Sequence, residues 1–343
     1  MANVNELIAY AKSQRGSDLH IAANLPVKCR IDGKITTLVD GVMTAADCDA
    51  IARELAGNKY DEACAVGELD MALTAECGVR CRVNIFKARD AFSFAIRLLS
   101  NEIPEISALE LPPAVMNFPN YQSGLVLVTG ETGSGKSTTL AAILDKINHT
   151  ESKHIITLED PIEYVYKPDR CLINQREIGR DTQSYANGLR AALREDPDVI
   201  LIGEMRDLET IETALTAAET GHLVFATLHT NSAADSVDRI ISVFPAARQQ
   251  QIRTQLAGAL KAVLAQQLIP RKEKGRIAAC EVMTVSSAIQ NLIREGKSQQ
   301  IENFIVMNGR EGNILMDNAV QNLMREGKVD MQEAQKRLRN QKK

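Results

Sequence analysis

The sequence predicts an α/β protein in which a domain with a largely parallel sheet follows a small α+β domain. Its 343 residues have an ordinary globular composition and exceed the usual size of a single hydrophobic core. Later in the chain, short apolar runs alternate with helical patterns, as in strands joined by right-handed crossovers. Residues 101–115 carry three prolines between the two patterns. We therefore expect domains at residues 1–105 and 106–343.

The first domain is expected to open with a helix and to continue as antiparallel strands. Apolar residues recur with helical spacing from Val4 to about Ser13. Within residues 27–38, Asp32 and Gly33 supply the positive-φ pair that a tight hairpin turn needs. Residues 78–99 then alternate between apolar and polar side chains, which predicts two half-buried strands.

Three arginines of this segment are candidates for holding an anion. Arg80 and Arg82 share one face of the first expected strand, and Arg97 lies within an apolar run. An arginine in such a run is usually held there by an anionic partner. The alternative is that the arginines are solvated charges at the edge of a sheet.

The second domain is expected to contain buried parallel strands, followed by a helical C-terminal part. Short apolar runs that suit strands covered on both faces are Gly124 to Thr129, His154 to Leu158, Val199 to Ile202 and Leu223 to Leu228. From about Ser232 the pattern becomes helical, with long segments at Gln249 to Leu268, Ser286 to Glu295, Asn313 to Arg325 and Met331 to Asn340.

Composition argues against several classes of protein. The net charge is −4 and the chain has no tryptophan, so neither a basic groove nor a base-stacking surface for nucleic acid is indicated. No leader or membrane-length apolar run is found, which favours a protein that stays inside the cell. The seven scattered cysteines suit reduced thiols, and the close pair Cys77 and Cys81 lacks further ligands for a zinc site.

The most specific motif is Gly130-Glu-Thr-Gly-Ser-Gly-Lys-Ser137, which matches the P-loop pattern between an expected strand and an expected helix. Its backbone N–H groups would surround the phosphates of ATP, with Lys136 at the β- and γ-phosphates and the Ser137 hydroxyl on Mg²⁺. The expected nucleotide-binding residues are Glu131, Thr132, Gly133, Ser134, Gly135, Lys136, Ser137 and Thr138.

Carboxylates follow two of the expected strands. Glu159 and Asp160 come after one strand with Glu163 close behind, and Glu204 comes after another. Because the carboxyl ends of parallel strands meet at one edge of a sheet, these acids should converge on the γ-phosphate and Mg²⁺. We assign Glu204 as general base and Mg²⁺ neighbour, Glu163 as the second choice for base, and Glu159 as a water-positioning or outer-shell group. The alternative is that these acids cap the helices that follow.

Two histidines flank the last of the expected strands. His222 precedes the strand and His229 follows it, so only His229 lies at the edge where nucleotide binds. A histidine there can donate a hydrogen bond to the γ-phosphate, which makes His229 a candidate sensor of ATP. The alternative for both residues is an ordinary packing role.

Taken together, the motifs GETGSGKST, ITLEDPIEY, ALREDPDVILIGEMRD and TGHLVFATLHTNSAADSVDRI resemble the Walker A, Asp, Walker B and His boxes of the secretion and type IV pilus ATPases. The resemblance implies a PAS-like N-terminal domain, a RecA-like ATPase domain and a ring of six subunits. It also implies a cytoplasmic location at the inner face of the membrane, beneath a platform protein, with a paralogous retraction ATPase as a further partner. Arg82 and Arg97 look like the family's arginines that reach a nucleotide site.

Within that family the chain looks like a pilus retraction ATPase, the motor of twitching motility. It has neither the long N-terminal extension nor the four-cysteine module typical of extension and type II secretion ATPases. Residues 288–295, AIQNLIRE, resemble a stretch usual in retraction ATPases, but Gln290 stands where arginine is typical. The alternatives are a paralogous extension, secretion or accessory retraction ATPase, a RecA-like nucleic-acid motor, and a nucleotide-dependent binding module without enzymatic activity.

Overall fold

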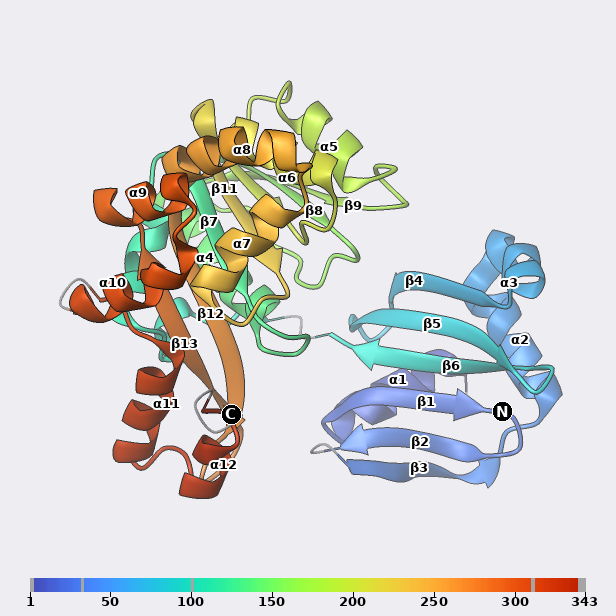
Figure 1. Cartoon of the computed structure of the whole chain (residues 1–343). Coiled ribbons are helices and arrows are strands. Elements are labelled where there is room, and N and C mark those ends of the chain that lie inside the picture. Colours follow the sequence, from blue (N-terminus) through green and yellow to red (C-terminus); the bar gives the residue numbers. More distant parts are fainter. Residues whose placement is uncertain (1–2, 32–33, 100–101, 310–311, 339–343) are drawn as a thin grey trace. The chain divides into compact units, whose positions relative to one another are not determined.

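The computed structural model describes residues 3–31, 34–99, 102–309 and 312–338 (Figure 1). The chain groups into two compact units, Met1–Glu102 with Pro161–Val165, and Ile103–Asp160 with Tyr166–Lys343. The domain boundary after residue 105 stays a prediction, and the grouping adds a short segment of the later sequence to the first unit.

The first unit is an antiparallel sheet with three helices. Its strands have the order β3-β2-β1-β6-β5-β4. The elements are α1 Val4–Ser13, β1 Gly16–Ala22, β2 Pro26–Ile31, β3 Lys34–Val42, α2 Ala45–Ala56, α3 Tyr60–Val66, β4 Glu68–Thr74, β5 Arg80–Ala88 and β6 Ala91–Leu98. Asn3 caps α1 and Thr44 caps α2, each in a capping box that satisfies N–H groups of the first turn.

The expected elements of this unit are confirmed. The helix from Val4 to Ser13 is α1, and residues 78–99 form the hairpin of β5 and β6. Ile31 of β2 pairs with Lys34 of β3, as a tight turn between them requires. The turn residues themselves, Asp32 and Gly33, lie outside the described residues.

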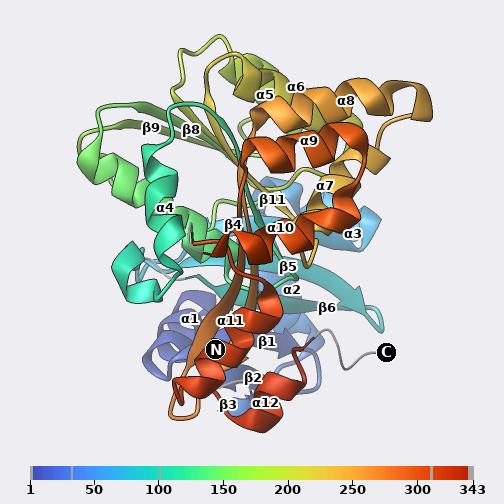
Figure 2. The same ribbon diagram turned by 60° about the vertical axis from the view of Figure 1, so that its left-hand side comes forward.

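The second unit is built on a sheet with the order β13-β12-β7-β11-β10-β8-β9, parallel except for β13. The expected strands are confirmed as β7 Gly124–Thr129, β8 His154–Glu159, β10 Val199–Ile202 and β11 Leu223–Leu228. The crossover helices are α4 Lys136–Thr150, α5 Tyr185–Ala192, α6 Leu208–Glu219, α7 Ala233–Ser242 and α8 Ala246–Ala259. The largest core lies between the sheet and helices that include α5 to α8, whereas α4 lies on the other side (Figure 2).

The helix expected from Gln249 to Leu268 is wrong in its second half. Helix α8 ends at Ala259, and the chain continues as β12 Leu260–Pro270 and β13 Arg276–Thr284. Alanine, leucine and glutamine favour a helix locally, but Val263 and Leu264 are fully buried on opposite faces of β12, beside β7. Burial on both faces of the sheet therefore outweighs the local preference. Strand β9, Leu172–Glu177, was also not predicted.

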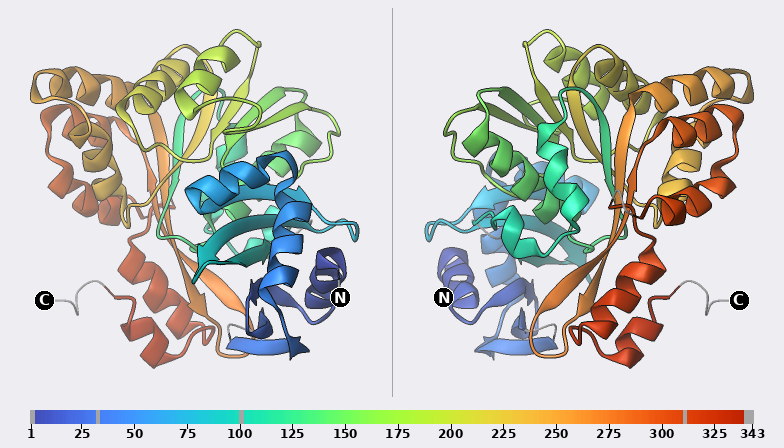
Figure 3. Two further views of the ribbon diagram at one scale, coloured as in Figure 1. Left: turned by 90° about the vertical axis from the view of Figure 1, so that its right-hand side faces the viewer. Right: turned by 90° about the vertical axis from the view of Figure 1, so that its left-hand side faces the viewer.

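The remaining helices cover one flank of the sheet and the far end of the β12–β13 ribbon (Figure 3). They are α9 Ser287–Glu295, α10 Ile301–Met307, α11 Met316–Arg325 and α12 Met331–Gln335. Helix α9 agrees with the prediction. Helix α11 starts later than the expected Asn313, α12 ends before the expected Asn340, and Asn340 lies outside the described residues.

Several expectations concern the described residues as a whole. No helix among them is long and apolar enough to cross a membrane. Within the same ranges, no cluster of histidine, cysteine, aspartate and glutamate side chains is placed to hold a metal ion. All seven cysteines are free thiols, in agreement with the prediction of reduced cysteines.

Candidate nucleotide site

The P-loop connects the end of β7 to the start of α4, as the motif predicts. Gly130, Gly133 and Gly135 have φ values of 138°, 79° and 92°, a region that side chains rarely adopt. A Cβ on Gly130 would lie 2.3 Å from the carbonyl oxygen of Gln266 on β12, so glycine is needed there for space as well as for conformation. The loop is thereby folded back on itself ahead of the helix, the geometry of a phosphate cradle.

The polar groups of this loop fit a phosphate ligand. Lys136 donates from Nζ to the carbonyl oxygens of Gly130 and Glu131 at 2.7 and 3.0 Å, which holds the ammonium over the loop. The hydroxyls of Thr129 and Ser134 are buried and have no hydrogen-bond partner in the described structure. Ser137 lies in the first turn of α4, where its hydroxyl could ligate Mg²⁺.

Glu204 follows β10, which β11 separates from the P-loop strand β7, and it makes two charged contacts. Its Oε1 lies 3.2 Å from Nε2 of His229, and its Oε2 lies 2.7 Å from a guanidinium nitrogen of Arg206. Burial raises the pKa of Glu204, but the Arg206 hydrogen bond and the charges of His229 and Arg206 outweigh it, so the pKa is lowered overall. The carboxylate is thus ionised at neutral pH, as a water-activating group must be.

The other two candidate acids are placed differently. Glu159 ends β8 and accepts hydrogen bonds through Oε1 from Thr157 at 2.7 Å and from Gln175 of β9 at 3.2 Å. These bonds fix its carboxylate at the carboxyl edge of the sheet. Glu163 is exposed in the segment Pro161–Val165, which groups with the first unit. The structure therefore brings Glu159 and Glu204 into one sheet edge and leaves the assignment of Glu163 as a prediction.

Gly203, which stands where many P-loop enzymes carry an aspartate, is explained by its surroundings. A Cβ there would lie 2.9 Å from the hydroxyl oxygen of Tyr185 and 3.1 Å from the carbonyl oxygen of Leu158. Thr227 also donates a hydrogen bond to the Gly203 carbonyl oxygen. Burial raises the pKa of Tyr185, and the charges of Asp160, Glu204 and Glu159 add to the effect. Sequence reasoning missed Tyr185, because no motif marks a tyrosine that packs against a glycine from another element.

The two histidines differ in their surroundings. Nδ1 of His222 lies 3.0 Å from the carbonyl oxygen of Ala217, near the end of α6, so this ring satisfies a helix terminus. His229 follows β11 directly, is about half exposed and contacts Glu204. The expected positions at opposite ends of the strand are confirmed, and they favour packing for His222 and the nucleotide edge for His229.

Arg82 and Arg97 are brought together within the first unit. They pair directly across β5 and β6, and Arg97 pairs in turn with Asp18 of β1. Nε of Arg97 lies 2.9 Å from Asp18, whereas Arg82 lies 3.9 Å from Asp70. Two like charges opposite one another are unfavourable unless an anion lies between them or beside them. Asp18 beside Arg97 and Asp70 near Arg82 supply such anions within this unit, so a role of the two arginines at a nucleotide stays a prediction.

Two arginines near the nucleotide edge of the second unit pair with glutamates. Arg206 contacts Glu204, and Arg190 of α5 pairs with Glu209. Arg194 lies beyond the end of α5. Among these three arginines, Arg206 is the one that contacts Glu204.

Comparisons with known proteins agree on one family. A family profile described as type II/IV secretion system protein matches residues 1–336. The uncharacterized protein YggR of Escherichia coli is 45% identical over 313 residues, 91% of this chain and 95% of that protein. The type IV pilus retraction ATPase PilT of Pseudomonas aeruginosa is 43% identical over 319 residues, 92% of both chains. A crystal structure of the pilus retraction motor PilT with bound ADP matches with a TM-score of 0.92 and 43% identity, covering 100% of this chain and 98% of that one.

Proposed function

The chain belongs to the type II/IV secretion system protein family, and from this we propose that it is an ATPase motor that drives retraction of a type IV pilus. The observation that carries the proposal is the contact of Glu204 with His229. These residues follow β10 and β11, and β11 lies next to the P-loop strand β7. The likeness to the Pseudomonas aeruginosa retraction ATPase over 92% of both chains supports retraction rather than another use of the same fold.

The residues of the site have different roles in ATP hydrolysis. The P-loop amides and Lys136 bind and orient the phosphates, and the Ser137 hydroxyl would hold Mg²⁺, which would supply positive charge to the phosphates. Glu204 accepts the proton of the attacking water, and Glu159 helps to orient that water. His229, next to Glu204, responds to the γ-phosphate and passes its presence to the loop that follows β11.

The motor is proposed to be a homohexamer in the cytoplasm at the inner face of the membrane. There it would act on a membrane platform protein of the pilus, with a paralogous retraction ATPase as a possible companion. A paralogous extension, secretion or accessory retraction ATPase is the second candidate, because such proteins share the same P-loop and Walker B chemistry. A nucleic-acid motor is disfavoured by the net charge of −4 and the absence of tryptophan.

Arg82 and Arg97 are proposed to complete the site of a neighbouring subunit. Replacing both with alanine is expected to leave ATP binding nearly intact and to lower turnover at least tenfold, about 1.4 kcal/mol of transition-state stabilisation. The reason is that a second-unit P-loop needs a further cation as charge develops on the γ-phosphoryl oxygens. The measurements are nucleotide affinity and steady-state phosphate release. Arg53→Ala, in an exposed ion pair with Asp49 on α2, is the matched control and should keep wild-type turnover.

Mixing two inactive chains tests whether the arginines act between subunits. A chain that lacks Arg82 and Arg97 still carries Glu204, and a Glu204→Gln chain still carries both arginines. Partial recovery of turnover in the mixture supports a ring in which each site draws on two subunits. Full activity of the double arginine variant by itself would instead show that these residues are solvated edge charges.

A further inference from the structure

Glu281 is a buried carboxylate that the site described above does not use. It lies in β13, its exposed fraction is 1%, and it pairs in register with Ala265 of β12. Its Oε1 accepts a hydrogen bond from the backbone N–H of Ala233 at 2.7 Å, and its Oε2 accepts one from the N–H of Met316 at 3.2 Å. Each carboxylate oxygen thus accepts a hydrogen bond from the first residue of a different helix, α7 or α11.

The chemistry of this contact explains why a carboxylate is tolerated inside the core. A buried carboxylate is costly unless hydrogen bonds and positive charge compensate for lost hydration. The first N–H groups of a helix are unpaired within the helix, and the helix dipole places positive potential there. Glu281 therefore accepts hydrogen bonds from the N-termini of two helices at once.

On one side, Glu281 fixes the chain that carries His229. Ser232 caps α7, and Ser236 donates a hydrogen bond to the Ser232 carbonyl oxygen at 2.6 Å. The hydroxyls of Ser236 and Thr230 lie 2.7 Å apart. Thr230, the residue after His229, is therefore linked through Ser236 to the first turn of α7. The Glu281 bond to Ala233 closes this short network. The position of His229 therefore depends on the start of α7.

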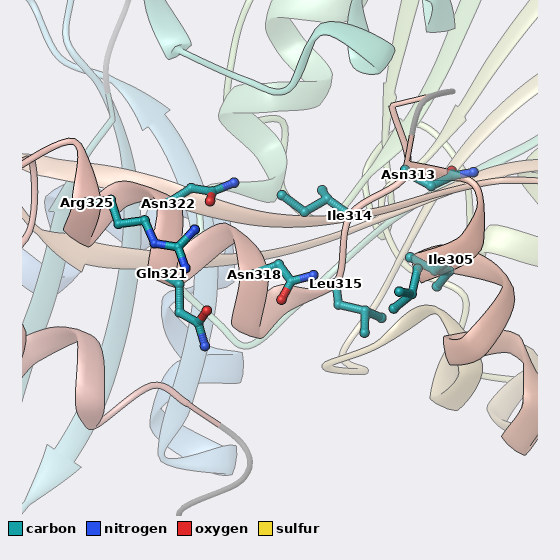
Figure 4. Close-up of a pocket in the computed structure, with 10 residues that line it drawn as sticks. Ile305, Asn313, Ile314, Leu315, Asn318, Gln321, Asn322 and Arg325 are labelled. Carbon is teal, nitrogen blue, oxygen red and sulfur yellow. The ribbon is translucent and has the colours of Figure 1, made fainter.

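On the other side, Glu281 fixes the start of the C-terminal helix pair. Ile314 pairs with Val282 in an antiparallel bridge, and Asn313 accepts a hydrogen bond from the Thr284 N–H at 2.6 Å. Figure 4 shows Asn313, Ile314 and Leu315 on the segment that leads into α11. Helix α11 then packs on the β12–β13 ribbon through Met316 and Val320.

The start of α11 also borders open space. A pocket of about 310 Å³ lies between this segment, α10 and α11, and is lined by Ile305, Asn318 and Arg325 among others. Close-packed interiors resist displacement, because any shift creates overlap or a void. The pocket borders the face of α11 that carries Asn318 and Arg325, whereas Met316 on the same helix is buried against the β12–β13 ribbon.

We propose that Glu281 is a positioning residue that couples the His229 loop to α11. In this account, a change in nucleotide at His229 moves the start of α7, and the shared carboxylate transfers the movement to the start of α11. The proposal rests on the proposed function, since it assumes that His229 responds to nucleotide. It adds a route by which that response leaves the nucleotide edge and reaches the C-terminal helices.

Hydrogen exchange of the full-length protein tests the coupling directly. Amide exchange is measured with ADP and with a non-hydrolysable ATP analogue for peptides that cover residues 130–138, 229–240 and 313–325. In the wild type, all three are expected to change between the nucleotides. In Glu281→Gln the amide can replace only one acceptor oxygen and carries no charge, so the response of 313–325 should be lost while that of 130–138 remains. Turnover is expected to fall on the order of tenfold at unchanged KM.

Controls separate coupling from a loss of stability. Asn148→Ala removes a buried side chain that bonds Lys167 and Asp169, away from Glu281, and should lower thermal stability without changing the exchange response. Glu281→Asp is one methylene shorter and cannot reach both helix starts, so it should restore only part of the turnover and only part of the 313–325 response; it also replaces Glu281→Gln if that variant does not fold. An unchanged response of 313–325 in the Glu281 variants would overturn the coupling. If 130–138 fails to respond in the wild type, the nucleotide site itself is wrong.

Discussion

ATP turnover by a Lys136→Ala variant is expected to fall to background, a loss of about 100-fold or more. The Lys136 ammonium lies over the P-loop, where it neutralises charge on the transferred phosphoryl group. Phosphate release by the purified protein measures the effect. Lys146→Ala, an exposed lysine on the same helix α4, is the matched control and should keep wild-type activity.

Adding DNA to the same assay separates the proposed motor from a nucleic-acid motor. Turnover of the wild type is expected to be insensitive to DNA, because the net charge of −4 and the absence of tryptophan disfavour a nucleic-acid partner. Wild-type hydrolysis by Lys136→Ala would reject the P-loop assignment. Strong stimulation by DNA would favour the nucleic-acid alternative.

A Glu204→Gln variant is expected to bind ATP with nearly normal affinity and to hydrolyse it about 100- to 10,000-fold more slowly. The substitution keeps the size of the side chain but removes the charge that accepts the proton of water. Nucleotide affinity and single-turnover rates distinguish binding from chemistry. Glu219→Gln is the matched control. Glu219 is the last residue of α6, the helix that follows the Glu204 loop, and its replacement should have no such effect.

The pH dependence of wild-type turnover adds a second readout for Glu204. Its pKa is lowered, so the charged form persists as the pH falls through the ordinary glutamate range and is lost only below it. The acid limb should therefore lie below about pH 4.3 as far as this group limits the rate. Collapse of ATP affinity with a surviving maximal rate in Glu204→Gln would make Glu204 a binding residue instead.

Much of the nucleotide edge could be predicted because its rules are local. The P-loop glycines are needed for their positive φ values. An apolar run followed by Glu204 or His229 places those side chains at the carboxyl end of a strand. These signals can be read from the sequence without knowing which segments pack beside them. The contact between Glu204 and His229 then follows from the adjacency of β10 and β11.

What could not be predicted depends on contacts between distant segments. The residues of β12 were predicted as helix, because their composition suits either a helix or a strand. Their pairing with β7 makes them a strand. The same holds for Tyr185 against Gly203 and for Glu281 at two helix starts, where no sequence spacing relates the partners. The Asp18–Arg97 pair likewise joins strands far apart in the chain.

Deleting the gene and scoring pili and surface movement tests the central claim most directly. If the chain powers retraction, the deletion strain should carry surplus surface pili and lack twitching motility. The wild-type gene should restore both properties, and a Glu204→Gln allele should restore neither. A deletion strain without surface pili would contradict retraction and identify an extension motor.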